Sequence, residues 1–179
     1  MNKKGFTTIE LILSFIMVVV ILTSLIGFTT AYRGRVNNEQ VKTQLIDFKN
    51  TVTRIVYDDI VNHDIVGMRE CVGEDNCVNL IGQDDNIHTL RSVYQYSTNN
   101  VDKKNNGVYI EYDGKKYKLP DSELNKTYTD SDLNVQVTDS ACNITGFEYK
   151  NYGNRIYTVK IPFKHYLINE EFEILITIS

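Results

Sequence analysis

The sequence lacks tryptophan, has only two prolines and three cysteines, and carries almost no charge in its first 32 residues. Neither proline comes before Pro120, so no proline interrupts a helix in the N-terminal part of the chain. The aromatic residues are mainly twelve tyrosines, a residue type that is enriched in β-strands. These features leave room for a long helix followed by a β-rich part.

The sequence also lacks the motifs of common enzyme classes. It contains no G-x-S-x-G, no phosphate-binding glycine loop and no dinucleotide-binding glycine pattern. Its three histidines, His63, His88 and His165, are scattered and form no H-E-x-x-H motif. We therefore expect that the protein is not an enzyme and has neither a cofactor nor a metal site.

A single carboxylate interrupts an otherwise apolar N-terminal segment. Between Lys4 and Arg33 the only charged residue is Glu10, and residues 11–26 read LILSFIMVVVILTSLI. A helix needs about 20 apolar residues to cross a bilayer, and a carboxylate at the edge of such a run costs about 2.5–3.5 kcal/mol. Lys3 and Lys4 before the run predict a cytoplasmic N-terminus with the rest of the chain outside. Glu10 should therefore have a partner and is a candidate functional residue.

Three interpretations of this segment are open. It can be a secretory signal peptide that is cleaved after residues 29–31 (Thr-Thr-Ala), or a membrane anchor that stays uncut. The third interpretation depends on the order K-K-G-F-T-T-I-E-L in residues 3–11. This order resembles the class III signal of type IV prepilins and pseudopilins, and only this interpretation gives Glu10 a role.

The resemblance to the type IV pilin and pseudopilin family implies a route of processing and assembly. A prepilin peptidase cuts between Gly5 and Phe6 and methylates the new N-terminus of Phe6, and the apolar helix is kept. In a filament, the carboxylate of Glu10 then meets the N-terminal amine of a neighbouring subunit. The implied partners are other pilin subunits, the prepilin peptidase and the inner-membrane assembly platform. The implied locations are the cell membrane before assembly and an extracellular pilus or pseudopilus afterwards.

Within this family the sequence favours a minor pilin. No cysteine follows Cys142, so the C-terminal disulfide loop of many major pilins is absent, and Gly27 stands where many of them carry a helix-breaking proline. The alternative is a pseudopilin of a type II secretion or competence DNA-uptake system, which has the same signal. The sequence leaves open whether such a subunit serves adhesion, motility or DNA uptake, and whether it sits at the tip or along the shaft.

The cysteines allow more than one disulfide pairing. Cys71 and Cys77 flank a polar loop and are the natural pair, but a bridge that uses Cys142, or no bridge, stays open. Zinc binding is disfavoured, because five residues separate Cys71 from Cys77 and no histidine lies nearby.

The chain beyond Tyr32 is acidic. It holds 17 basic residues (all 19 except Lys3 and Lys4) and 22 acidic ones (all 23 except Glu10). Affinity for nucleic acid depends mainly on neutralising phosphates, so direct binding of nucleic acid is not expected.

The sequence predicts an α+β fold in which a long N-terminal helix packs on an antiparallel β-sheet head. Apolar residues recur at steps of three and four along the second half of a helix that runs from about Thr7 to about Asn62, as expected for one buried face. These residues are Val41, Leu45, Phe48, Val52, Ile55, Val56 and Ile60.

Beyond this helix, residues 67–85 are predicted to be an irregular polar loop, and Asp113-Gly114 the turn of a hairpin. The predicted strands are residues 92–97, 108–112, 115–119, 133–137, 144–150, 155–163 and 171–178. The predicted division of the chain is a leader peptide at 1–5, an apolar transmembrane and assembly helix at 6–32, an amphipathic helix of the head at 33–62 and a β-rich globular head at 63–179.

Processing at Gly5 predicts the mass of the mature protein. Protein recovered from its native cells is expected to begin at N-methylated Phe6, because the peptidase cuts before the apolar run. Intact mass and N-terminal peptide mapping measure this directly. A mature chain that begins near Tyr32 would instead identify a conventional signal peptide and a secreted domain.

Overall fold

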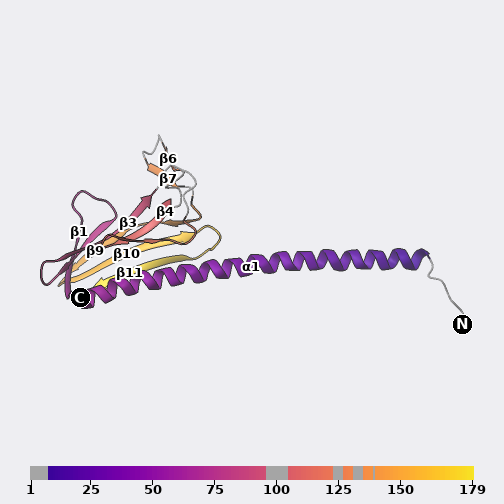
Figure 1. Ribbon diagram of the computed structural model, residues 1–179, viewed down its shortest axis with the longest axis horizontal. Helices are drawn as coiled ribbons and strands as arrows, with labels where there is room; N and C mark the ends of the chain where they lie inside the picture. Colours follow the sequence, from indigo (N-terminus) through magenta and orange to yellow (C-terminus); the bar gives the residue numbers. More distant parts are fainter. Residues whose placement is uncertain (1–7, 96–104, 123–126, 131–134, 139) are drawn as a thin grey trace. The chain divides into compact units, whose positions relative to one another are not determined.

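The computed structural model describes residues 8–95, 105–122, 127–130, 135–138 and 140–179 (Figure 1). One long helix, α1 (Thr8–Asn62), precedes strands that pair antiparallel throughout. The strands are β1 (Ile65–Glu70), β2 (Cys77–Gly82), β3 (Ile87–Gln95), β4 (Gly107–Tyr112), β5 (Lys115–Lys118), β6 (Thr127–Asp130), β7 (Val135–Thr138), β8 (Cys142–Ile144), β9 (Glu148–Gly153), β10 (Ile156–His165) and β11 (Glu171–Ile178). The predicted α+β class and the predicted extent of the helix are confirmed.

The chain divides into two compact units, Met1–Gln40 and Val41–Ser179. In the first unit, residues 8–40 are helical and every one of them is exposed. The second unit, which we call the head from here on, comprises the rest of α1 and all the strands that the structure describes. The division coincides with the first buried residue of the helix, Val41.

One face of α1 forms part of the core of the second unit. Val41, Leu45, Val52 and Val56 are at most 6% exposed, and Phe48, Ile55 and Ile60 pack against the same core as partly buried residues. The ring of Phe48 meets that of Phe163 on β10 edge-on, with centroids 5.8 Å apart. The face predicted from the helical spacing is therefore the buried one.

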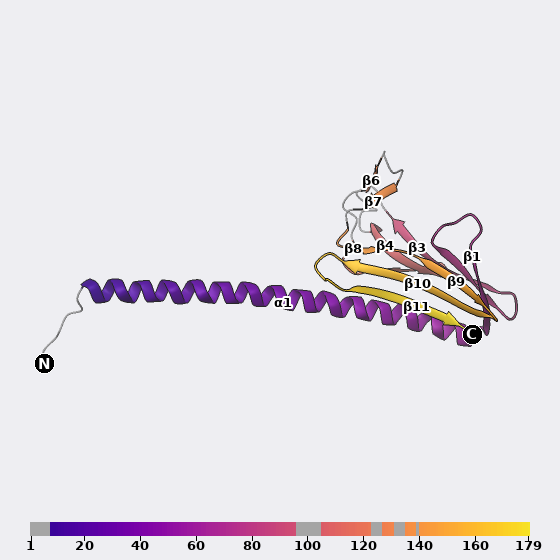
Figure 2. The same ribbon diagram turned by 180° about the vertical axis from the view of Figure 1, so that it is seen from behind.

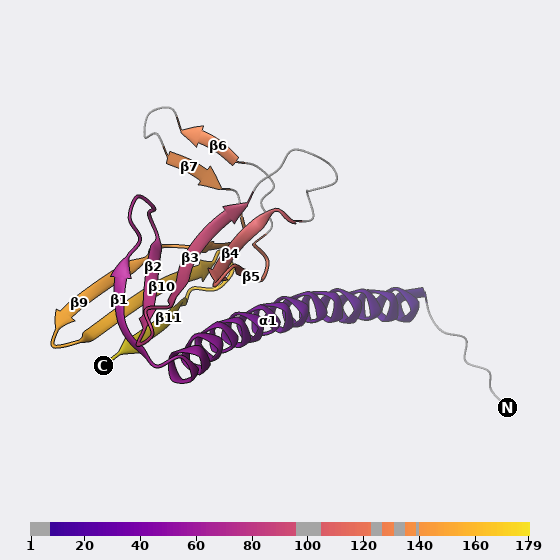
Figure 3. The same cartoon turned by 60° about the vertical axis from the view of Figure 1, so that its left-hand side comes forward.

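Two sheets complete this core. The first has the strand order β1-β2-β3-β4-β5, and the second the order β11-β10-β8, with β9 also paired to β10 (Figures 2 and 3). Buried residues from both sheets belong to one cluster with the helix, among them Leu80, Leu90 and Ile110 of the first sheet and Ile161 and Ile174 of the second. Within the described residues, strands β6 and β7 form a separate two-stranded sheet. The head is thus built around a single helix face that two sheets share.

Several predicted strands have the expected positions. The β4–β5 hairpin turns at Asp113 (φ 48°) and Gly114 (φ 77°), and two successive residues with positive φ are what a type I′ turn requires. Strand β11 has the predicted bounds, and β3 covers the described part of the predicted strand 92–97. The predicted strand 144–150 is divided between β8 and β9. Both pair with β10, on either side of Pro162, which has no N–H to donate.

The prediction of an irregular loop over residues 67–85 is wrong. Strands β1 and β2 occupy most of it, and only residues 71–76 and 83–85 lie outside them. The polar residues of this segment, among them residues 73–76, favoured the prediction of a loop. In the structure, however, β2 forms hydrogen bonds with β1 on one side and with β3 on the other. This pairing buries Val78 and Leu80 completely. Contacts distant in sequence therefore decided the conformation of this segment.

Truncating the buried helix face should destabilise the head. Leu45 is fully buried, so Leu45→Ala is expected to lower the free energy of unfolding by about 2–5 kcal/mol through lost burial and the cavity left behind. The neighbouring Ile46 is an isomeric side chain that is 38% exposed, and Ile46→Ala should cost much less. Urea unfolding of the full chain in a non-ionic detergent, followed by tyrosine fluorescence, compares the two. Equal losses of unfolding free energy in the two variants would show that burial of this helix face does not stabilise the head.

Candidate functional site

Glu10 lies in the first turn of α1, two residues after the helix begins. A carboxylate is favourable at this end of a helix, because the unpaired N–H groups of the first turn carry partial positive charge. Gly5 and Phe6, the predicted processing residues, lie outside the described residues. The structure therefore places Glu10 at the start of the apolar helix.

The apolar half of α1 presents its side chains to the outside of the chain. Leu11, Phe15 and Phe28 are 65–70% exposed, and other large apolar side chains between Ile9 and Tyr32 are more than 40% exposed. The helix is long and apolar enough to span a bilayer. A single-chain protein in water rarely exposes so extended an apolar surface, which marks a site for contact with membrane or protein.

Five hydroxyl groups in this half form hydrogen bonds within the helix itself. Ser14 donates to the carbonyl of Glu10 at 2.7 Å, Ser24 to that of Val20 at 2.8 Å, and Thr30 to that of Ile26 at 2.8 Å. Thr23 and Thr29 make similar bonds. Because a polar group without a hydrogen bond is expensive in an apolar medium, this internal bonding suits the helix to lipid or to a helix-packed interior.

The cysteine arrangement is defined in the structure. Cys71 and Cys77 form a disulfide with Cα atoms 5.4 Å apart, and the N–H of Cys71 donates to the carbonyl of Cys77 at 3.2 Å. The bridge therefore closes the loop between β1 and β2. Cys142 is free and fully buried, and burial raises the pKa of its thiol to about 12.

A polar cleft of about 390 Å³ lies beside this disulfide. The guanidinium of Arg91 lines it and is held by two carboxylates, with Nη2 2.7 Å from Glu111 Oε1 and Nη1 3.1 Å from Glu74 Oε2. The hydrogen bonds to Glu111 and then Glu74 raise the pKa of Arg91 above its usual value. With its charge balanced by two carboxylates, this arginine gives the cleft little attraction for an anion.

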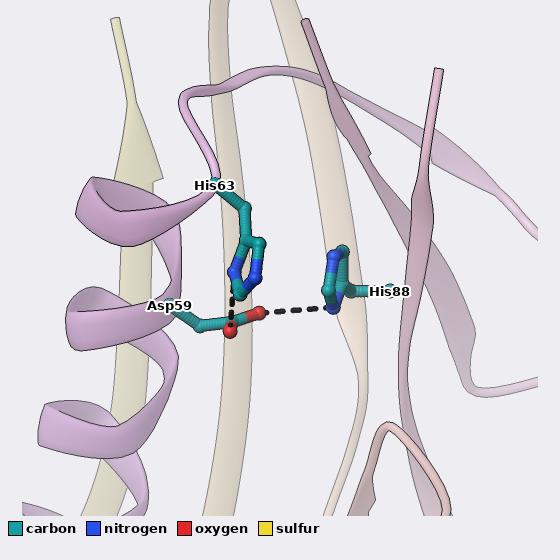
Figure 4. A group of neighbouring side chains, drawn as sticks. All are labelled: Asp59, His63 and His88. Carbon is teal, nitrogen blue, oxygen red and sulfur yellow. Dashed lines mark ion pairs between the residues drawn. The ribbon is translucent and has the colours of Figure 1, made fainter. Parts of the chain in front are cut away.

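The structure also brings together residues that the sequence analysis kept apart. His63 and His88 meet at the carboxylate of Asp59, whereas His165 lies elsewhere, with Nε2 3.7 Å from Asp121 (Figure 4). One local signal was available, because Asp59 and His63 are four residues apart and such residues lie on the same face of a helix. His88 could not be placed without the register of β3.

Comparison with protein-family models, with curated protein sequences and with solved structures finds no match to this chain. A long N-terminal apolar helix followed by antiparallel sheets is compatible with a pilin-like architecture. The N-terminal motif and this architecture are therefore the two observations that bear on function.

Thiol labelling tests the disulfide pairing. In the folded, unreduced protein we expect no reaction with a maleimide at pH 7.5, because Cys142 is buried and protonated. In urea one thiol should react in the natural sequence and none in Cys142→Ser. A reactive thiol in unfolded, unreduced Cys142→Ser would show that Cys142 takes part in the bridge. Mass spectrometry counts the labels.

Proposed function

We propose that this protein is a type IV pilin-like structural subunit, processed by a prepilin peptidase and assembled into a cell-surface filament as a minor pilin. The observation that carries the proposal is the carboxylate of Glu10 in the first turn of a helix that is apolar and carries no other charge before Arg33. Neither a signal peptide nor a plain anchor needs a charge at this position.

A filament gives the exposed helix a partner along its whole length. Apolar helices from neighbouring subunits can cover one another, and the small residues Gly27 and Gly34, where a Cβ atom would meet open space, permit close approach of helices. Before assembly the same surface suits the membrane. The hydroxyl groups, which are bonded within the helix, are compatible with both environments.

In the assembled state the carboxylate of Glu10 has a specific role. In an apolar filament core a lone carboxylate is expensive, whereas one paired with the N-terminal ammonium of a neighbouring Phe6 sets the register between subunits. The partners proposed for the subunit are therefore other pilin subunits, the prepilin peptidase and the inner-membrane assembly platform. The proposed role is structural, without catalysis.

The head is proposed to face outward. It has its own core, independent of the exposed half of α1, so it can stay folded while that half moves from membrane to filament. The assignment to a minor subunit is supported by the position of the disulfide, which closes the β1–β2 loop and not a loop near the C-terminus.

Replacing Glu10 should separate processing from assembly. Glu10→Ala is expected to be cleaved normally but to be nearly absent from sheared filaments, because breaking a buried ion pair costs about 3–5 kcal/mol. Glu39→Ala removes the same charge from the same helix, outside the apolar run, and should assemble at the level of the natural sequence. Immunoblots of membrane and sheared fractions give the measurement. Wild-type amounts of Glu10→Ala in filaments would refute this role.

A further inference from the structure

The end of α1 and the first sheet bring three potential metal ligands together. Asp59 lies in the last turn of α1, His63 directly follows the helix, and His88 lies on β3. Asp59 Oδ1 is 2.8 Å from His63 Nδ1, and Asp59 Oδ2 is 3.0 Å from His88 Nδ1 (Figure 4). One ligand atom from each residue lies within 4.8 Å of the other two.

The local backbone explains why these side chains converge. The N–H of His63 still donates to the carbonyl of Asp59 at 2.9 Å, so both residues lie on one helical turn. The helix then stops, and Asp64 adopts a φ of 45°, a left-handed conformation that often terminates helices. From the other side, the pairing of β2 with β3 sets His88 opposite the buried Leu80. The rings of His63 and His88 are 4.8 Å apart, centroid to centroid.

The two ring nitrogens of His88 are buried but lack hydrogen bonds within the described part of the chain, which is unusual for an imidazole inside a protein. Its side chain is 12% exposed, and neither ring nitrogen has a hydrogen-bond partner among the residues that the structure describes. Nδ1 is close to Asp59 Oδ2, but the angles are not those of a hydrogen bond. Buried nitrogen atoms of this kind are normally satisfied, and an ion is one of the partners that can satisfy them.

The carboxylate of Asp59 is oriented by a second contact. The phenol of Tyr112 on β4 donates a hydrogen bond to Asp59 Oδ2, and the rings of Tyr112 and His88 are stacked with centroids 6.4 Å apart. Carboxylates that ligate metals are commonly hydrogen-bonded in this way, which fixes the oxygen that faces the ion. Oδ1, on the side of His63, is the oxygen that this contact leaves for an ion.

We propose that Asp59, His63 and His88 form a binding site for a divalent transition metal ion of the zinc type, which joins the end of α1 to the first sheet. Two imidazole nitrogens and one carboxylate oxygen suit zinc and its neighbours, whereas calcium and magnesium prefer oxygen ligands alone. This proposal differs from the sequence analysis, which led us to expect no metal site. It does not depend on the proposed function, since all three residues belong to the head.

The geometry needs only a small adjustment to hold zinc. Tetrahedral zinc with bonds of about 2.0–2.1 Å separates its ligand atoms by roughly 3.4 Å, so ligand atoms that lie within 4.8 Å of one another must approach by at most about 1.4 Å. The side chain of His63 is 45% exposed, which leaves it free to rotate and opens a path to solvent. Asp113 Oδ2, in the β4–β5 turn, is 3.6 Å from His88 Nδ1, so the fourth position is within reach of this carboxylate or of water.

Zinc titration of the full chain tests the site. The protein is prepared in a non-ionic detergent without a polyhistidine tag, with its disulfide intact, and is titrated with zinc chloride by calorimetry and by long-range ¹H–¹⁵N spectra of the imidazoles. We expect one zinc per chain, with shifts of His63 and His88. His165 is the internal control and should not shift. Absence of binding, or equal shifts of all three histidines, would overturn the proposal.

Matched substitutions assign the ligands. Asp59→Asn and His63→Gln should each weaken zinc binding at least about tenfold, because the loss of a ligand costs no less than the loss of an outer-shell partner. Asp58→Asn makes the same chemical change at the adjacent, exposed position and should leave the affinity unchanged. His63 is half-exposed at the end of the helix, so His63→Gln should fold even if a change at His88 does not. Undiminished affinity in both Asp59→Asn and His63→Gln would also overturn the site.

Discussion

The burial of one face of α1 is the constraint on which the rest of the head depends. Val41, Leu45, Val52 and Val56 lie on this face, and buried residues of both sheets join them in one core. Neither sheet has another helix in the described residues to cover it. Two contacts at the end of the helix fix its position further: Tyr57 accepts a hydrogen bond from the N–H of Thr177 on β11, and Asp59 accepts one from Tyr112 on β4. The helix thereby holds the two sheets together.

The two halves of α1 suit different environments. After Val41 its buried apolar residues lie on one face, so water can cover the opposite one. Between Ile9 and Tyr32 it is apolar on all sides apart from Glu10, exposes its large apolar side chains, and bonds five hydroxyl groups within the helix. Such a surface is stable only in lipid or against other apolar helices. Glu10 is compatible with the second environment when a neighbouring positive charge is present, which is the physical basis of the proposed assembly role.

The Asp59–His63–His88 cluster lies where the amphipathic half of the helix ends and the first sheet begins. A metal ion there would cross-link residues that are brought together only by folding, and its binding free energy would add to the stability of the head. The disulfide at the opposite end of the β1–β2 hairpin also restricts the first sheet, because it closes the loop between two of its strands. The first sheet would then be held by an ion at one end of β1 and by a covalent bridge at the other.

Features that depend on near neighbours along the chain can be predicted from the sequence alone. The spacing of Val41, Leu45, Val52 and Val56 predicts the buried helix face, and Asp113-Gly114 predicts its own turn. Only the tertiary structure decided the conformation of β1 and β2, because their hydrogen bonds come from strands that the local pattern does not identify. It also decided the meeting of His63 with His88, which depends on strand register: a shift of one residue in β3 would turn His88 to the opposite face of the sheet.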